Sequence, residues 1–255
     1  MNSEVVNYYS PNFDLTEKEV AQRTAPSYCK VPIWTPKEGQ NLIRILPPWN
    51  EKGLVFKVLA LHWFGSKNNR VATLCLRQFQ KRCYICEIIQ KLLAAEVLTK
   101  ETARVYYAVK RAFCNGLDLK ELDKGVQIMS LPIKKVVQSL INYAKDPEYG
   151  DFTHPENGYD IKIEKETAGL YPDYNVIPAR KSSPLPDKRY LKELYNLDDF
   201  ENIWIVHSYD EQKELWNIYA DVIRTEEEEN EEIEEPKLPE DIPLEVGKKE
   251  IDLGV

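Results

Sequence analysis

Short runs in which apolar and polar residues alternate recur between residues 39 and 179. Segments 40–49, 54–64, 103–113 and 126–132 read as strands, as does a hairpin over 159–179 that turns around Gly169 and Pro172. Segment 133–145 instead repeats its apolar residues every three to four positions, which predicts an amphipathic helix before the last hairpin. Five strands with such a helix favour an OB-type barrel.

Helical periodicity also appears outside this strand-rich region. It covers residues 86–98, between two predicted strands, and later residues 188–197 and 209–223. Residues 1–30 show no sustained period apart from a short helix expected near Thr16, where a Thr-Glu-Lys-Glu sequence resembles a capping box. These residues form an N-terminal arm in our interpretation.

The charge is distributed unevenly along the chain. The net charge is −8, but residues 225–255 carry thirteen acidic and three basic residues, a net of −10. Residues 1–224 therefore hold 42 − 13 = 29 acidic and 34 − 3 = 31 basic residues, a net of +2. Eight glutamates fall within residues 226–235 and prolines follow, so we expect residues 225–255 to be a disordered acidic tail.

Cysteine usage and hydropathy bear on the cellular compartment. An odd number of cysteines, five, with no N-terminal signal-peptide pattern favours reduced thiols or metal ligands over disulfides. No run approaches the length of apolar sequence that a membrane span requires. We expect a soluble protein of the cytoplasm, that of the host cell if the protein is viral, with no membrane partner.

One histidine and three cysteines have the spacing of a metal site. Twelve residues separate His62 from Cys75, seven separate Cys75 from Cys83, and two separate Cys83 from Cys86. The Cys-x-x-Cys pair lets both thiolates reach one Zn²⁺, and two further ligands complete a tetrahedron. Four protein ligands leave no open position, so the prediction is one structural zinc. The alternative is that these cysteines are ordinary small buried residues.

Known catalytic patterns are missing from the sequence. Zinc deaminases need His-x-Glu and a proline before the Cys-x-x-Cys pair, whereas Trp63 and Phe64 follow His62 and Arg82 precedes Cys83. Phosphate-binding glycine loops and nucleophile–base pairs are also absent from the sequence. We therefore expect a binding protein and no enzyme.

Aromatic residues are interleaved with basic ones in several predicted strands. Non-specific binding of single-stranded DNA uses aromatic faces to stack on bases and cations to contact phosphates. The alternative is that these aromatics fill the core and the charges are solvated. The candidates from the residues are Lys57, Trp63, Tyr106, Tyr107, Lys110, Arg111, Tyr171, Tyr174, Arg180 and Lys181, together with Arg44 on the first strand.

The ordered segments resemble a known family, the single-stranded DNA-binding, helix-destabilising proteins of T4-type bacteriophages. The matching segments, within residues 39–185, are NLIRILP, LALHWF, CYIC, VYYAVKRAF, NGYDIKIEK and GLYPDY. The resemblance implies an OB-fold core, the four zinc ligands above, and an acidic C-terminal tail. It implies phosphate contacts at Arg44 and Lys110 and places Tyr106, Tyr107, Tyr171 and Tyr174 in the DNA cleft.

Two further features concern self-association. The RKSS sequence at 180–183 is similar to a short motif that the family uses in self-association and DNA contact. The basic N-terminal arm that supports cooperative binding in the family has no counterpart, since residues 1–17 contain no lysine or arginine. Self-association along DNA is therefore an open expectation.

The sequence as a whole predicts a β-rich α+β protein in four parts. They are an N-terminal arm (1–30), an OB-fold core (31–185) with an inserted zinc subdomain (62–98), a C-terminal helical segment (186–224) and the acidic tail (225–255). We expect it to coat single-stranded DNA in replication, recombination and repair, with the tail recruiting replication and recombination proteins. The main alternative is a zinc-containing transcription or RNA-binding adaptor.

Overall fold

The strands occupy most of the predicted strand regions. A computed structural model of the chain describes residues 28–65, 70–168 and 172–220. The predictions of an arm helix near Thr16, a hairpin turn at Gly169 and a disordered tail lie outside these residues. The strands in the described part are β1 (Ile33–Trp34), β2 (Gly39–Ile45), β3 (Lys57–Phe64), β4 (Val71–Leu74), β5 (Val109–Asp118), β6 (Gln127–Pro132), β7 (Ile161–Glu166) and β8 (Asp173–Pro178).

The strands form one mixed sheet centred on β5. Its order is β1-β6-β5-β2-β7-β8; β3 also pairs with β5, and β4 extends the sheet from β3. The pairing of β1 with β6 is parallel and the others are antiparallel. The pairings define a mixed α+β sheet, and among the described residues no ladder joins β1 to β8.

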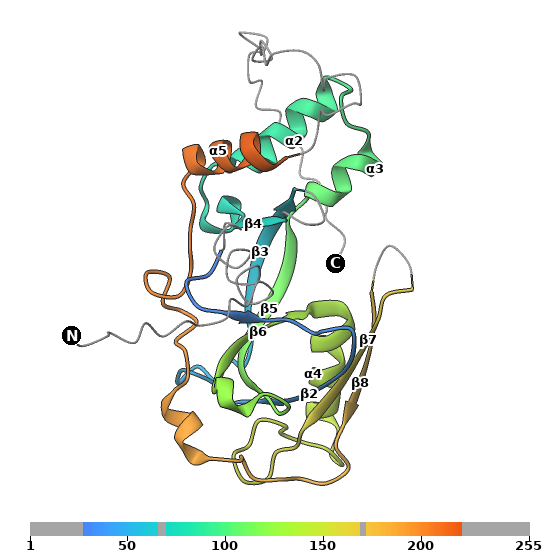
Figure 1. The fold of residues 1–255 in the computed structure, drawn as a ribbon, viewed down its shortest axis with the longest axis vertical. Helices are drawn as coiled ribbons and strands as arrows, with labels where there is room; N and C mark the ends of the chain where they lie inside the picture. The colour runs from blue at the N-terminus through green and yellow to red at the C-terminus, as the bar shows by residue number, and fades with distance from the viewer. Residues whose placement is uncertain (1–27, 66–69, 169–171, 221–255) are drawn as a thin grey trace, which may run out of the picture. The chain divides into compact units, whose positions relative to one another are not determined.

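Four α-helices are present in the described part. They are α2 (Tyr84–Ala94), α3 (Lys100–Ala103), α4 (Gln138–Lys145) and α5 (Tyr209–Tyr219). A π-helical turn at Ile133–Val137 leads into α4, which packs on β8. Helices α2 and α5 pack on each other and lie with α3 near β3 and β4, whereas α4 lies beside the β7–β8 hairpin (Figure 1).

Two predicted elements differ from the structure. The strand expected over 103–113 begins only at Val109, because Thr99 caps α3 through the Thr102 amide and the helical turns continue to Tyr106. The helix expected over 188–197 is only a 3-10 turn, Lys188–Lys192. Strand β4 was not predicted, because its four residues are all buried and show no alternation of apolar with polar positions.

The apolar faces of the sheet are covered from two directions. Helix α4 and the preceding turn cover Ile43, Ile45 and Leu131 with Val136 and Leu140. A second set of buried residues joins Phe113 to the C-terminal segment, where the rings of Phe113 and Trp204 meet edge to face at 4.9 Å: Tyr28, Leu59, Leu61, Leu74, Ile128, Leu197 and Ile203 complete this layer. Residues 186–220 are thus part of the core that supports β3 and β5.

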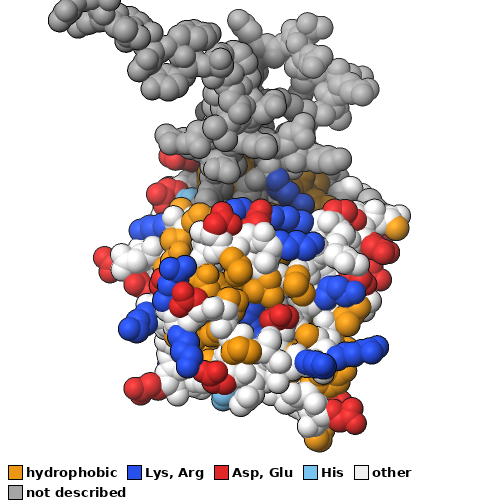
Figure 2. Space-filling model, turned by 60° about the horizontal axis from the view of Figure 1, so that its bottom comes forward, with side chains coloured by type: hydrophobic (Ala, Val, Ile, Leu, Met, Phe, Trp, Pro, Cys, Tyr) orange, Lys and Arg blue, Asp and Glu red, His pale blue; other side chains and the backbone are white. Residues whose placement is uncertain are grey.

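Surface charge on the face shown in Figure 2 is mixed. Lysine and arginine side chains alternate with aspartate and glutamate, and apolar side chains lie between them. No helix in the described part of the chain is long and apolar enough to cross a membrane. Charge alone does not mark a binding surface on this face, so a candidate site has to be built from individual residues.

Candidate metal centre and nucleic-acid interface

The four predicted metal ligands meet where β3, β4 and α2 converge. His62 lies on β3, Cys75 follows β4, Cys83 is the N-cap residue of α2 and Cys86 lies in its first turn. Antiparallel pairing sets His62 opposite Thr73, two residues before Cys75. The Cys-x-x-Cys spacing brings the other two thiols to the amino end of α2, where the helix dipole favours thiolates.

The distances between the ligand atoms suit a tetrahedral metal site. Cys75 Sγ lies 4.0 Å from Cys83 Sγ and 3.7 Å from Cys86 Sγ, and His62 Nε2 lies 3.4 Å from both Cys83 Sγ and Cys86 Sγ. A tetrahedron with ordinary zinc bonds requires about 3.8 Å between sulfurs and about 3.6 Å between nitrogen and sulfur. All four ligand atoms lie within 4.8 Å of one another, so the cluster could hold a metal such as zinc.

The surroundings of the cluster orient its ligands. His62 is buried, and its Nδ1 lies 2.8 Å from the carbonyl oxygen of Tyr106. Nδ1–H donates to that carbonyl, which leaves Nε2 free to face the thiols, the arrangement that second-shell carbonyls impose on metal-bound histidines. Because four protein ligands fill a tetrahedron, this centre is suited to a structural role and not to the activation of water.

Without a metal, His62, Cys83 and Cys86 carry shifted pKa values. Burial lowers the pKa of His62, but hydrogen bonds with Cys75, Cys83 and the Tyr106 carbonyl outweigh it and raise the pKa to about 9. Hydrogen bonds with Cys75 and Cys86 lower the pKa of Cys83, whereas those with Cys75 and Cys83 raise that of Cys86. The cluster therefore shares its protons, and a bound metal would displace them.

The aromatic candidates nearest the metal centre lie just before β5. Tyr106 ends a 3-10 turn before β5 and is half-buried against Trp216, with ring centroids 5.2 Å apart. Tyr107 is 42% exposed and remains available for stacking on a base. Lys110, the second residue of β5, is exposed.

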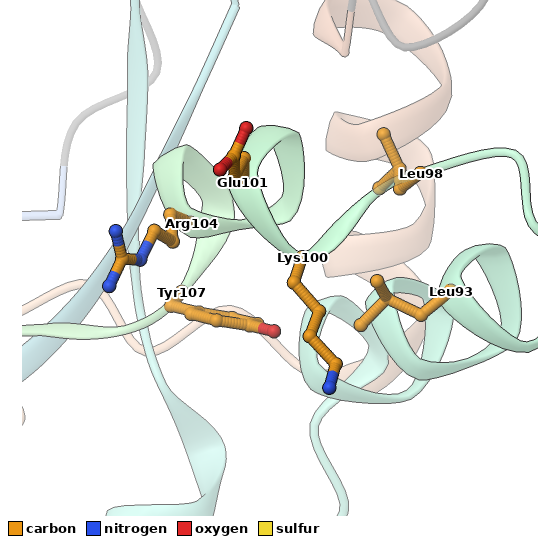
Figure 3. Close-up of a pocket in the computed structure, with 6 residues that line it drawn as sticks. All are labelled: Leu93, Leu98, Lys100, Glu101, Arg104 and Tyr107. Carbon is orange, nitrogen blue, oxygen red and sulfur yellow. The ribbon is translucent and has the colours of Figure 1, made fainter.

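Tyr107 contributes to a pocket between the end of α2 and the helical turns that follow (Figure 3). The pocket encloses about 640 Å³ and is lined by Leu93, Leu98, Lys100, Glu101, Arg104 and Tyr107. In Figure 3 the side chains of Lys100 and Arg104 lie on either side of the Tyr107 ring. The pocket thus combines an exposed aromatic face with two cations and one carboxylate.

A second group of candidates surrounds Arg111. Its guanidinium donates to Ser130 Oγ at 3.1 Å and to the Ser130 carbonyl at 2.8 Å. Burial lowers the pKa of Arg111 while the neighbouring Tyr174 and Tyr28 oppose that shift. Burial likewise raises the pKa of Tyr174, and Arg111 opposes it. Arg111 and Tyr174 are therefore brought together from β5 and β8 as half-buried partners.

Arg44 does not fit the predicted phosphate contact. Its side chain is fully buried and pairs with Asp160 Oδ1 at 3.1 Å, and it also donates to Ser183 Oγ and to the carbonyls of Ser183 and His154. A guanidinium without exposed surface cannot reach a phosphate in this conformation. The residue instead ties β2 to the loops at 154–160 and 180–183.

Two other candidates are also engaged with the protein. Lys57 Nζ lies 2.6 Å from Asp198 Oδ1 and 5.1 Å from the ring centre of Phe200, so an acidic group already neutralises its charge. Trp63 is half-buried, packs edge to face on Tyr28 and carries the Arg70 guanidinium 5.3 Å from its ring centre. Neither presents a free cation or an open aromatic face.

The remaining candidates fall on the last hairpin and just beyond it. Arg180 and Lys181 are exposed in the segment after β8. Tyr171 lies outside the described residues. The three candidates therefore stay predictions about the DNA-binding surface.

Sequence reasoning missed Lys100, Arg104 and Gln212. Arg104 opens the same basic-aromatic run that contains Tyr107 and Lys110, so its signal was present in the sequence. Lys100 follows Thr99, whose capping box predicts a helical turn. Gln212, which lies against Cys83, shows no local signal, because its position is set by packing over a long sequence separation.

A half-buried aromatic and basic surface beside a closed His/Cys₃ cluster is typical of a nucleic-acid-binding protein with a structural metal. The family model described as gp32 DNA binding protein like matches residues 37–234. The chain therefore belongs to this family of DNA-binding proteins, and the match confirms the resemblance found in the sequence. Members of the family are typically not enzymes. No curated protein gives a significant match to the chain.

Proposed function

We propose that this protein coats single-stranded DNA with little sequence preference during replication, recombination and repair, and that a structural zinc ion stabilises its DNA-binding surface. The observation that carries the proposal is the pocket in which Tyr107 lies between Lys100 and Arg104. A base can stack on the tyrosine while the cations contact the adjoining phosphates, which is how non-specific single-strand binding is achieved. Membership of a DNA-binding family supports the same function.

The DNA path that we propose continues from this pocket along β5. Lys110 lies three residues after Tyr107, and its exposed side chain makes no ion pair or hydrogen bond with the residues that the structure describes. Arg111 and Tyr174 extend the path toward β8, and Arg180 and Lys181 would contact the backbone beyond it. We propose an OB-type core beneath this surface, built from strands β2, β3, β5, β6, β7 and β8 of the sheet.

The zinc ion supports this surface through the Tyr106 backbone. His62 donates to the Tyr106 carbonyl, and Tyr107 is the next residue along the chain. A metal held by His62 and the three cysteines would fix the imidazole, and the imidazole would fix the peptide that precedes the stacking residue. Loss of the metal would therefore weaken DNA binding by loosening Tyr107 and not by removing a DNA contact.

The acidic tail supplies a second level of control in this proposal. Residues 225–255 carry a net charge of −10 and are tethered to a body of net +2. A tethered polyanion competes with DNA phosphates at high effective concentration, and the same segment can bind replication and recombination proteins. Salt screens the competition, because the Debye length falls to a few Å at about 1 M salt.

The test separates stacking from charge on fluorescently labelled oligo-dT. Replacement Tyr107→Ala should weaken binding by about 1–3 kcal/mol and leave its salt dependence unchanged. Replacement Lys110→Ala should reduce the slope of log affinity against log salt by about 0.7, the value for one phosphate contact. Lys192→Ala, an exposed lysine outside the proposed path, is the matched control and should bind as the parent does.

Two results would overturn the proposal. Unchanged affinity in both Tyr107→Ala and Lys110→Ala would show that the strand does not cross this surface. Equal or greater affinity for an RNA of matched sequence would instead favour an RNA-binding adaptor, because RNA recognition commonly uses contacts to the 2′-hydroxyl.

A further inference from the structure

Helix α5 lies directly against the cluster of His62, Cys75, Cys83 and Cys86. Gln212 is fully buried, and its side-chain amide lies between Cys83 Sγ, at 3.3 Å from Oε1, and the carbonyl oxygen of Leu74, at 2.9 Å from Nε2. Leu74 is the residue before Cys75. A single side chain of α5 therefore contacts one ligand and the backbone beside another.

A second residue of α5 supports the histidine ligand. The ring of Trp216 packs on Tyr106 with centroids 5.2 Å apart and on Phe64 at 5.6 Å. Tyr106 is the residue whose carbonyl accepts the hydrogen bond from His62 Nδ1. Phe64 lies two positions beyond His62 on β3, on the same face of the strand. Trp216 thus packs on the residue whose carbonyl orients the imidazole and on a second residue of the strand that carries His62.

The start of α5 is joined to the helix that carries the other two ligands. Tyr209 Oη donates to Glu87 Oε2 at 2.8 Å, and Glu87 also pairs with Arg82 at 2.8 Å. Glu87 follows Cys86 and Arg82 precedes Cys83 in the sequence. At the other end of the site, His207 Nδ1 lies 3.0 Å from Oγ1 of Thr73 on β4.

We propose that α5 is the outer support of the metal centre, in which Gln212 and Trp216 are positioning residues that slow metal release. Helix α5 then contacts each of the four ligands either directly or through a residue that adjoins it in the chain or hydrogen-bonds to it. Since coupling between two binding events is reciprocal, the bound metal also holds α5 in place. The inference rests on the metal site proposed above, but it does not depend on DNA binding.

Packing alone does not account for these contacts. A fully buried amide has to find hydrogen-bond partners: without a metal the Cys83 thiol donates to Gln212 Oε1, and Gln212 Nε2 donates to the Leu74 carbonyl next to Cys75. A metal-bound Cys83 thiolate has no proton to donate, so the bond that holds the metal-bound site is the one from Nε2 to the backbone beside Cys75. A leucine at this position would fill a similar volume but could not bond to either group. Second-shell partners of this kind orient metal ligands, and their loss costs roughly 10- to 100-fold in metal affinity.

The first experiment measures cobalt and zinc binding in Gln212→Leu and Trp216→Phe. Co²⁺ bound by thiolates gives an intense charge-transfer absorption, and a competing chelator then reports affinity and release rate. We expect Gln212→Leu to bind roughly 10-fold more weakly and to release metal faster. Trp216→Phe should show a smaller loss, since it keeps an aromatic ring. Ile218→Ala, at a position on α5 that is 69% exposed, is the control and should match the parent.

The second experiment uses the parent chain, so a variant that fails to fold cannot obscure the result. Removal of the metal with a chelator should raise hydrogen exchange in residues 209–219 while residues 161–166 of β7 stay protected. Unchanged exchange in α5, or metal affinity in Gln212→Leu equal to that of the parent, would overturn the inference. Absence of a cobalt charge-transfer band in the parent would instead overturn the metal site itself.

Discussion

Arg44 offers the sharpest separation between a structural residue and a DNA contact. Its NH1 and NH2 groups make four hydrogen bonds, one of them to the Asp160 carboxylate at 3.1 Å, and its side chain has no exposed surface. Replacement Arg44→Met keeps most of the volume but leaves Asp160, Ser183 and the His154 carbonyl without this partner. Removing one member of a buried ion pair typically destabilises a protein by about 3–5 kcal/mol.

The expected loss lies at the lower end of that range. The Asp160 side chain is 30% exposed, so water can solvate it once Arg44 is gone. We expect a decrease of about 3 kcal/mol in the free energy of unfolding, measured by urea denaturation. Arg44→Lys keeps the charge but loses the planar guanidinium with its several donors. Its free energy of unfolding should therefore lie between those of the parent and Arg44→Met.

The same variants test the position of the DNA. Under conditions where Arg44→Met remains folded, its affinity for oligo-dT should have the parental salt dependence, because a guanidinium without exposed surface does not reach a phosphate. A loss of less than about 1 kcal/mol in stability together with a flatter salt dependence would refute this reasoning. Arg44 would then be a phosphate contact, as the sequence resemblance implied.

Three further outcomes are expected. Purified protein should contain one equivalent of zinc, and Cys86→Ala should lose the metal and lower the melting temperature, as elemental analysis and calorimetry would show. A chain truncated after residue 224 should bind oligo-dT more tightly than the full chain at low salt and equally at high salt, and equal binding at low salt would exclude competition by the tail. Hydrogen bonds from Lys57 and Trp49 lower the pKa of Asp198 to about 2, so its contribution to stability is present above about pH 4 and is lost as the pH falls toward 2. Asp198→Asn should therefore flatten the loss of urea stability over that pH range, and an unchanged acid profile would contradict the ion pair.

The sequence predicted that His62, Cys75, Cys83 and Cys86 come together, because most of the spacing that joins them is short. Cys83 and Cys86 had to lie within one helical turn, and strand pairing placed His62 near Cys75. The aromatic-basic run was found for the same reason, although α3 delays the strand that was expected to begin at residue 103. These features depend on neighbours along the chain.

The features that sequence reasoning could not find depend on distant contacts. Arg44 looks like any basic residue on a strand, and only Asp160 and the loop at Ser183 make it a buried structural group. Lys57 is likewise neutralised by Asp198, a residue 141 positions away. Gln212 reaches Cys83 across 129 positions, so a helix predicted to belong to a separate C-terminal segment is joined to the His/Cys cluster.

Direct comparison of single-stranded and duplex DNA tests the proposed function most simply. Anisotropy titrations of zinc-loaded protein with labelled oligo-dT and with a duplex of equal length, each at about 50 and 200 mM salt, would give both preference and salt dependence. We expect tighter binding to the single strand at both salt concentrations, with affinity falling as salt rises. Equal or tighter binding to the duplex would contradict the proposal that this protein coats single-stranded DNA.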